Sequence, residues 1–155
     1  MKKLGVVHNT DEIVLKDTTV TLTSKIQGLG KIVTNSASGV DIGVSGSPAT
    51  IVELSVETNY YNLLPLTVTA TPSGLGTSES ATIHVIAVLD DDSTVEIATR
   101  TTAAGSTSTE TITIGDMDFT GISSGRQIRT IRVTAESSAT STSATLDATV
   151  AALEM

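Results

Sequence analysis

Three consecutive aspartates form the acidic cluster of this sequence that is best suited to hold a hard cation. Asp90, Asp91 and Asp92 stand in a polar turn between two apolar segments, and Asp116 and Asp118 could contribute if their loop lies alongside. Calcium takes about six to eight oxygen ligands, and protein loops supply them from carboxylates and backbone carbonyls. A solvated hairpin turn explains the same residues, and we favour that interpretation over a metal site.

Residues that could carry out catalysis are scarce. The chain has two histidines, His8 and His84, and no cysteine. His84 lies in an apolar stretch, on the face opposite Ile83 and Val85, where a structural role is the favoured interpretation. No Gly-x-Ser-x-Gly elbow is present, and the run 28–30 (GLG) lacks the third glycine of a nucleotide-binding loop. The sequence therefore predicts no catalytic residue, no cofactor and no enzymatic activity.

Two groups of residues could instead make contacts with partners. Tyr60 and Tyr61 are two of only three aromatic residues. Exposed aromatic pairs anchor protein interfaces, so we take the two tyrosines as interface candidates, although they could equally close one end of a core.

Arg126, Arg129 and Arg132 form the densest basic patch, and we expect them to pair with surface acids. Arg129 and Arg132 differ in parity along their strand, which predicts that they point to opposite faces.

Composition and charge exclude several classes of partner. The formal net charge is −8 and the pI is about 4.5, whereas nucleic-acid binders need a basic face that displaces counterions from phosphate. The same sign argument disfavours anionic membranes. Hydrophobic residues make up 39% of the chain and charged residues 17%, a balance that is typical of folded and not of disordered chains.

The elements that must position these residues read as β-strands. Serine and threonine make up 46 of the 155 residues, and β-branched threonine favours a pleated, half-exposed surface. Apolar and polar residues alternate with a period of two, which marks antiparallel strands with one wet face. The segment 81–89 is apolar on both faces and predicts a central strand that is covered on both sides. Strands are expected near 4–8, 12–16, 19–26, 31–35, 50–57, 65–71, 80–89, 94–99, 108–114, 127–136 and 143–153.

This number of short strands, separated by turn signals, predicts an all-β fold: a two-sheet antiparallel β-sandwich or jelly roll. The core is expected to be filled by the apolar members of the alternating segments. These are Val52, Leu54, Val56, Leu66, Val68, Ile83, Val85, Ala87, Leu89, Val95, Ile97, Ile112, Ile114, Ile131, Val133, Leu146, Ala148 and Val150.

The first part of the chain differs from the rest. Residues 1–48 are richer in glycine and lysine and have weaker strand patterns, so we expect an N-terminal arm or small β subdomain there and the sandwich domain over 49–155. The apolar stretch near the N-terminus ends at Val7, which is too short for the core of a signal peptide. We therefore expect no signal peptide and synthesis in the cytoplasm.

From about Thr50 to Glu154 the chain resembles small virion β-sandwich proteins of tailed phages and related viruses: head decoration proteins, head fibres and turret-like jelly rolls. The shared features are threonine-rich alternating strands, an acidic pI, few aromatics and no cysteine. The resemblance implies a non-enzymatic structural protein that is synthesised in the host cytoplasm and located at the capsid surface of the virion. It also implies a homo-oligomer, with a trimer favoured, that binds a major capsid or other virion protein. The alternative is a carbohydrate- or receptor-binding module of the adhesin or fibre type, although the absence of tryptophan counts against sugar binding.

Overall fold

The computed structural model describes residues 31–58, 63, 65–123 and 125–154. Apart from one short 3₁₀ helix, η3 (Asp116–Phe119), the regular structure of this part of the chain is β-strand, which confirms the all-β prediction. The strands expected near 4–8, 12–16 and 19–26 lie outside the described residues. The eight strands are β1 (Lys31–Asp41), β2 (Ala49–Thr58), β3 (Leu66–Ser73), β4 (Ala81–Leu89), β5 (Thr94–Thr101), β6 (Glu110–Ile114), β7 (Ile128–Ser137) and β8 (Thr145–Glu154).

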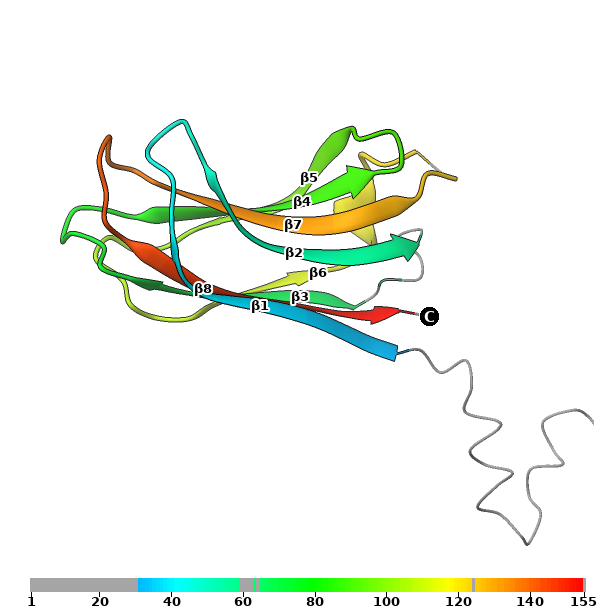
Figure 1. Ribbon diagram of the computed structural model, residues 1–155, viewed down its shortest axis with the longest axis horizontal. Helices are drawn as coiled ribbons and strands as arrows, with labels where there is room; N and C mark the ends of the chain where they lie inside the picture. The colour runs from blue at the N-terminus through cyan, green and yellow to red at the C-terminus, as the bar shows by residue number, and fades with distance from the viewer. Residues whose placement is uncertain (1–30, 59–62, 64, 124, 155) are drawn as a thin grey trace, which may run out of the picture. The chain divides into compact units, whose positions relative to one another are not determined.

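The strands form two four-stranded antiparallel sheets that pack face to face (Figure 1). One sheet has the order β1-β8-β3-β6 and the other has the order β2-β7-β4-β5. The first strand pairs with the last, the second with the second-last, and so on towards the middle of the chain. The resulting pairs are β1–β8, β2–β7, β3–β6 and β4–β5. This is the order obtained when one long antiparallel ribbon is rolled up, and it is the strand order of a jelly roll.

The core lies between the sheets and follows the period-two alternation of the strands. In β3, Leu66, Val68 and Ala70 are buried while Thr67 and Thr69 are half-buried on the outer face. Of the eighteen predicted core residues, all but Val95 are buried, and Val95 is partly buried and packs against the others. Because the side-chain period of a strand is two, this result also confirms the faces that we assigned to the strands.

The prediction that 81–89 is covered on both sides was wrong. β4 is a central strand, between β7 and β5, but Thr82, His84 and Ile86 on its outer face are only half-buried. No described element covers this part of the sheet. The apolar character of the outer face comes mainly from Ile86 and from Val88, which is buried near the end of the strand.

The prediction that Arg129 and Arg132 point to opposite faces was also wrong. Both side chains are partly exposed to solvent, and neither enters the core. The register of β4 and β7 passes from Val88↔Thr130 to Leu89↔Ile128, so Arg129 has no partner opposite it on β4. An extra residue of this kind is a β-bulge, and it reverses the parity of everything beyond it.

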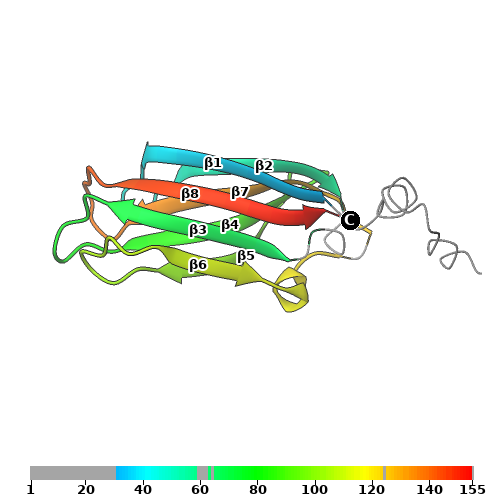
Figure 2. The same ribbon diagram turned by 90° about the horizontal axis from the view of Figure 1, so that it is seen from below.

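Residues 32–154 form one compact unit. Residues 32–48, which belong to the expected N-terminal arm or subdomain, therefore pack with the sandwich. Their strand β1 is an edge strand of the first sheet, next to β8 (Figure 2). After β1, Gly43 donates a backbone hydrogen bond to the carbonyl of Ala135 in β7 and thereby carries the chain from one sheet to the other.

Candidate interaction surface

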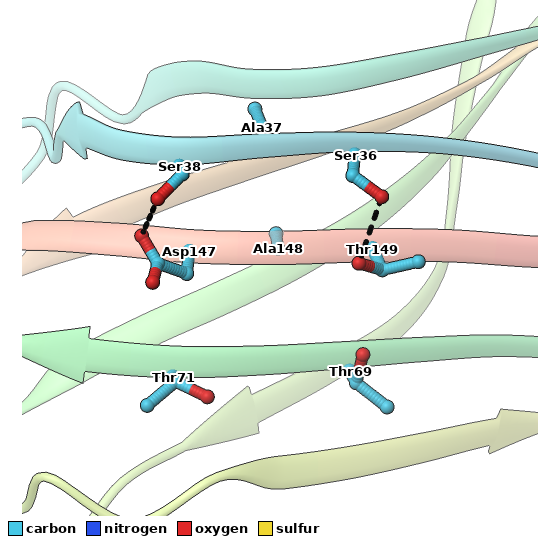
Figure 3. A pocket seen from close by; sticks show the side chains of 8 residues that line it. All are labelled: Ser36, Ala37, Ser38, Thr69, Thr71, Asp147, Ala148 and Thr149. Carbon is cyan, nitrogen blue, oxygen red and sulfur yellow. Dashed lines mark hydrogen bonds between the residues drawn. The ribbon is translucent and has the colours of Figure 1, made fainter.

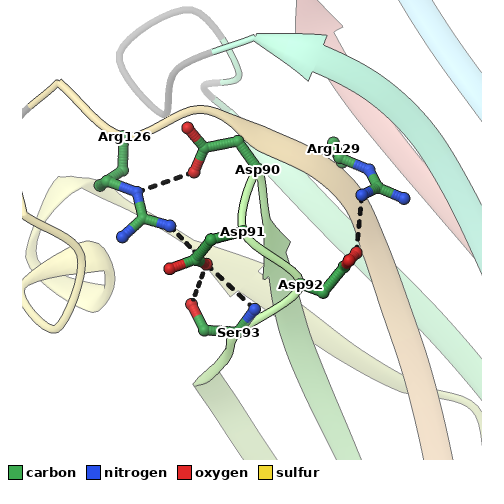
Figure 4. Close-up of polar contacts among 6 residues, drawn as sticks. All are labelled: Asp90, Asp91, Asp92, Ser93, Arg126 and Arg129. Atoms are coloured by element: carbon green, nitrogen blue, oxygen red, sulfur yellow. Dashed lines mark hydrogen bonds and ion pairs between the residues drawn. The ribbon is translucent and has the colours of Figure 1, made fainter.

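The acidic turn between β4 and β5 is occupied by arginine side chains (Figure 4). Arg126, just before β7, places its Nε 2.7 Å from Asp90 Oδ1 and also forms an ion pair with Asp91. Arg129, the bulged residue of β7, places its Nη1 2.6 Å from Asp92 Oδ1. The expectation that these arginines pair with surface acids is confirmed, since Arg132 likewise pairs with a glutamate of β2.

Hydrogen bonds hold the central aspartate of this turn in its ionised form. The hydroxyl and backbone N–H of Ser93 both donate to Asp91 Oδ1. Together with the Arg126 guanidinium, they lower the pKa of Asp91 far below its usual range, with the Ser93 hydroxyl as the largest cause. The two aspartates in turn raise the pKa of Arg126. The charges of this cluster are thus paired among the protein's own groups.

The other residues considered for calcium do not complete a site in the described part of the chain. Asp118 accepts a hydrogen bond from the backbone N–H of Gly115 at 2.8 Å, within its own turn. The side chain of Asp116 lies outside the described residues. Among the side chains that are described, no group of three or more His, Cys, Asp or Glu residues comes together in a way that could hold a metal ion. The solvated-turn interpretation of Asp90–Asp92 stays a prediction that can be tested by metal removal.

His84 lies on the outer face of the second sheet between two carboxylates. Its Nδ1 is 2.6 Å from Glu96 Oε2, and its Nε2 is 3.7 Å from Glu136 Oε1. Glu136 also accepts a hydrogen bond from the backbone N–H of Gly46. These contacts link strands β4, β5 and β7, so the surroundings of His84 are those of a residue that ties strands together. His8 lies outside the described residues.

A polar hollow lies on the outer face of the first sheet, over β1, β8 and β3 (Figure 3). Several of its hydroxyl groups are already hydrogen-bonded, among them Thr71, whose hydroxyl is 2.7 Å from that of Thr109. The Ser36 and Thr149 hydroxyls are 3.0 Å apart, and Asp147 Oδ1 accepts both the Ser38 hydroxyl at 2.8 Å and the Gly39 N–H at 2.6 Å. The pKa of Asp147 is lowered, first by the Gly39 N–H and then by Ser38. The hollow could hydrogen-bond a polyhydroxylated ligand, but it presents no aromatic platform, because Phe119, the one aromatic side chain described, is buried.

A second hollow on the same face is apolar, and sequence reasoning did not find it. It is lined by Ile32, Pro65, Ala151 and Leu153, together with two neighbouring residues of β3 and β8. Ile32 is 71% exposed and is the one large hydrophobic residue that is exposed in the described part of the chain. The sequence held one signal of this exposure. Ile32 stands an even number of positions from the outward-facing hydroxyl residues of β1, so it lies on the same face of the strand as they do.

The residues that line this apolar hollow include Ile32, near the start of β1, and Leu153, near the end of β8. Figure 1 shows that β1 begins and that β2 and β8 end at this end of the sandwich. Tyr60 and Tyr61, the predicted interface residues, belong to the connection from β2 to β3 and lie outside the described residues. Flanking them, β2 ends at Thr58, and Leu63 is fully buried. We call this region, with Ile32, Pro65 and Leu153 at its centre, the terminal end.

Comparison with models of known protein families finds no match, and comparison with curated protein sequences finds none either. Over the described residues, no helix has the length and apolar character that would be needed to cross a membrane.

Proposed function

We propose that the protein is a non-enzymatic structural component of a virus or phage particle, that it decorates or stabilises the capsid surface, and that it acts as a homo-oligomer. The observation that carries the proposal is the strand order β1-β8-β3-β6 and β2-β7-β4-β5. Jelly rolls with two Greek keys are characteristic of viral capsid proteins and lectins. Fold alone does not decide function, so the surface of the molecule must support the same conclusion.

A structural role is supported by the charged surface groups that pair with one another within the protein. Arg126 is paired with Asp90 and Asp91, His84 lies between two carboxylates, and Asp147 accepts two hydrogen bonds. A catalytic site needs a polar group that is poised to contact a substrate and has a shifted pKa suited to proton transfer. The pKa shifts at Asp91 and Asp147 are downward, which suits permanently charged structural carboxylates.

The proposed docking surface is the terminal end together with the segment 1–48 and the Tyr60-Tyr61 connection. Contiguous exposed apolar patches mark interaction sites, and Ile32 forms such a patch with Pro65 and Leu153 of the apolar hollow. A protein with a net charge of −8 and a hydroxyl-covered surface should resist non-specific association, so association must depend on a specific patch. In this proposal the partner is a major capsid or other virion protein, and the assembly is a closed ring, with a trimer favoured.

The proposal is tested by co-sedimentation with empty capsids assembled from the major capsid protein encoded in the same genome. We expect the wild type to co-sediment and the variant lacking residues 1–30 to stay in the supernatant. The double variant Tyr60→Ala, Tyr61→Ala should also lose binding. As a matched control, Thr113→Ala on the far edge of the first sheet should bind normally. Folding of each variant is checked by circular dichroism, and full binding by both altered proteins would overturn the proposal.

The carbohydrate- or receptor-binding alternative is favoured by the polar hollow over β1, β8 and β3. A glycan array would detect it, with Ser38→Ala and Asp147→Ala as variants that should lose the signal. A monomeric wild type that binds a glycan through these residues, and that does not bind capsids, would favour this alternative over the virion protein.

A further inference from the structure

The two sheets have four edge strands, β1 and β6 in one sheet and β2 and β5 in the other (Figures 1 and 2). The outer edge of such a strand carries unpaired N–H and C=O groups that can pair with another chain. Natural proteins protect these edges with charges, prolines, bulges, short strands or a covering side chain. The four edges of this protein can therefore be compared for the protection that each one has.

Three of the four edges are protected. β6 is only five residues long, and its Glu110 forms an ion pair with Arg100 of β5 at 3.1 Å, so charges lie at both of these edges. β5 also carries the exposed Glu96 and a register shift against β4. β2 has two register shifts against β7 and carries the exposed Glu53, whose carbonyl is covered by the Asn35 side chain at 2.7 Å.

β1 has fewer of these protections, and the one at its centre is a side chain: Asn35 Oδ1 accepts the backbone N–H of Ser36 at 2.9 Å. The strand is eleven residues long, and between Lys31 and Asp41 it has no charged residue and no proline. Its backbone is extended as far as Ser38, and a positive φ of 64° occurs only at Gly39. In the described part of the chain no strand lies beyond β1 in the sheet order. Its inward-facing Val33 and Ala37 are only partly buried.

We propose that β1 pairs with β1 of a second copy of this chain, in an antiparallel arrangement about a two-fold axis near Ser36. This arrangement joins the two four-stranded sheets into one sheet of eight strands. Two features of β1 favour a second copy over an unrelated partner. Its ends carry opposite charges, so antiparallel pairing brings Lys31 of each copy to the end of the strand where Asp41 of the other copy lies. The faces of β1 also suit self-pairing: Thr34, Ser36 and Ser38 face outward together with Ile32, and Val33 and Ala37 face inward on either side of Asn35.

The contact buries groups that the isolated chain leaves half-covered. Val33 and Ala37 of the two copies lie on the same side of the joined sheet, where Ala37 of one copy lies opposite Asn35 of the other. Thr34, Ser36 and Ser38 extend the outward row of hydroxyl groups across the junction. Cross-strand pairs of this kind, with side chains about 4.5–5.5 Å apart at Cβ, are the unit of sheet stabilisation.

This inference rests on the homo-oligomer of the proposed function and specifies one of its contacts. A two-fold contact is distinct from the ring contact that would form a trimer. On a closed shell, trimers on three-fold axes meet their neighbours across two-fold axes, and β1 is the self-complementary surface that suits this second contact. In solution the inference predicts pairs of chains, or pairs of rings.

The chain has no cysteine, so single cysteines can map the contact directly. We expect oxidation of Ser36→Cys to give a covalent dimer on a denaturing gel. A mixture of Thr34→Cys and Ser38→Cys should cross-link with each other faster than either does with itself, because the axis lies midway between these positions. As a matched control, Thr113→Cys, on the opposite edge of the same sheet, should stay monomeric on the gel. Failure of all three β1 variants to cross-link would overturn the inference.

A charge placed on the edge provides an independent readout. In Ser36→Lys the two new ammonium groups would face each other across the axis, where like charges are destabilising. We expect about a tenfold or larger rise in the dissociation constant of the pair by sedimentation velocity, whereas Thr113→Lys should leave it unchanged. A wild type whose association is the same as that of Ser36→Lys would overturn the inference. Loss of pairing with capsid binding retained would leave the proposed function standing, and pairing without capsid binding would leave only the β1 contact standing.

Discussion

Arg126 Nε lies 2.7 Å from Asp90 Oδ1, and this contact ties the β4–β5 turn to the segment that leads into β7. The backbone repeats the connection, because the Asp90 N–H donates to the carbonyl of Gln127 at 3.0 Å. A run of three aspartates would repel itself if it were left alone. Here the neighbouring segment contributes two arginines that offset part of this negative charge, which favours a solvated turn over a metal site.

Metal removal should therefore leave the stability of the protein unchanged. We expect the melting temperature to be the same with EDTA and with added calcium, because Arg126 and Arg129 already pair with the carboxylates of Asp90–Asp92. Differential scanning calorimetry measures this directly. A melting temperature that falls by many degrees in EDTA and returns with calcium would show a structural calcium site in this turn.

Acidification should destabilise the protein in part through Asp91. Its pKa in the folded state is lowered by Ser93 and Arg126, so the unfolded chain binds a proton more readily than the folded one does. The stabilisation is therefore complete above the unfolded pKa of about 3.9 and is lost as the pH falls below it, towards the folded pKa. The variant Asp91→Asn should have a lower melting temperature at pH 7 and a smaller further loss on going to pH 3. Equal losses in wild type and variant over this range would contradict the prediction.

Two isoleucines of β4 test the assignment of its faces. Ile83 is fully buried between the sheets, whereas Ile86 is half-buried on the outer face. We expect Ile83→Ala to lower the free energy of unfolding by about 2–5 kcal/mol, as for other cavity-forming changes. For Ile86→Ala we expect about 1 kcal/mol, because less apolar area returns to water. Urea denaturation of the two variants makes the comparison, and a similar cost for both would show that the outer face is covered.

The sequence was sufficient to predict the fold class and the part of the core that the alternating strands supply, because these depend on a local, period-two pattern; buried residues between strands, such as Leu63 and Phe119, were not predicted. Val68 and Ile112, for example, are paired neighbours in the core, and each was assigned from the alternation of its own strand. The bulge at Arg129 could not be predicted in this way, because one extra residue leaves no mark in a stretch that alternates normally on both sides. The outer face of β4 was misjudged because apolar residues there do not report whether another layer covers them.

The candidate surfaces were harder to predict, because they depend on contacts between residues far apart in the chain. Gly39 and Asp147 are separated by 108 positions, and nothing in either local sequence indicates that they are bonded. We expected the arginines to pair with surface acids. That Arg126 pairs with Asp90 in particular follows only from the strand order, which places the segment before β7 next to the β4–β5 turn. The alternation of β1 indicates that Ile32 faces outward, but the apolar hollow beside it forms only when β1 lies next to β8 and β3.

Asp147 should control how firmly β1 is held to the sandwich. Its Oδ1 accepts hydrogen bonds from the Ser38 hydroxyl and the Gly39 N–H, so one carboxylate of β8 fastens the end of β1. Edge strands open locally at lower free energy than central ones, and hydrogen exchange reports that opening. We expect Asp147→Ala to speed amide exchange in β1 while exchange in the central strands β7 and β4 stays unchanged.

The matched control is Thr149→Ala, which removes the neighbouring hydroxyl contact to Ser36 but leaves Gly39 bonded. Its effect on β1 should be clearly smaller, because a hydrogen bond to a charged acceptor is stronger than one between two hydroxyls. The wild type should also lose part of its β1 protection in acid, since the pKa of Asp147 is lowered by the same two donors and the contact weakens as the carboxylate takes up a proton. Hydrogen exchange with mass spectrometry, corrected for the intrinsic pH dependence of exchange, measures both effects. If Asp147→Ala and Thr149→Ala speed exchange in β1 equally, then the carboxylate has no special part in holding this edge.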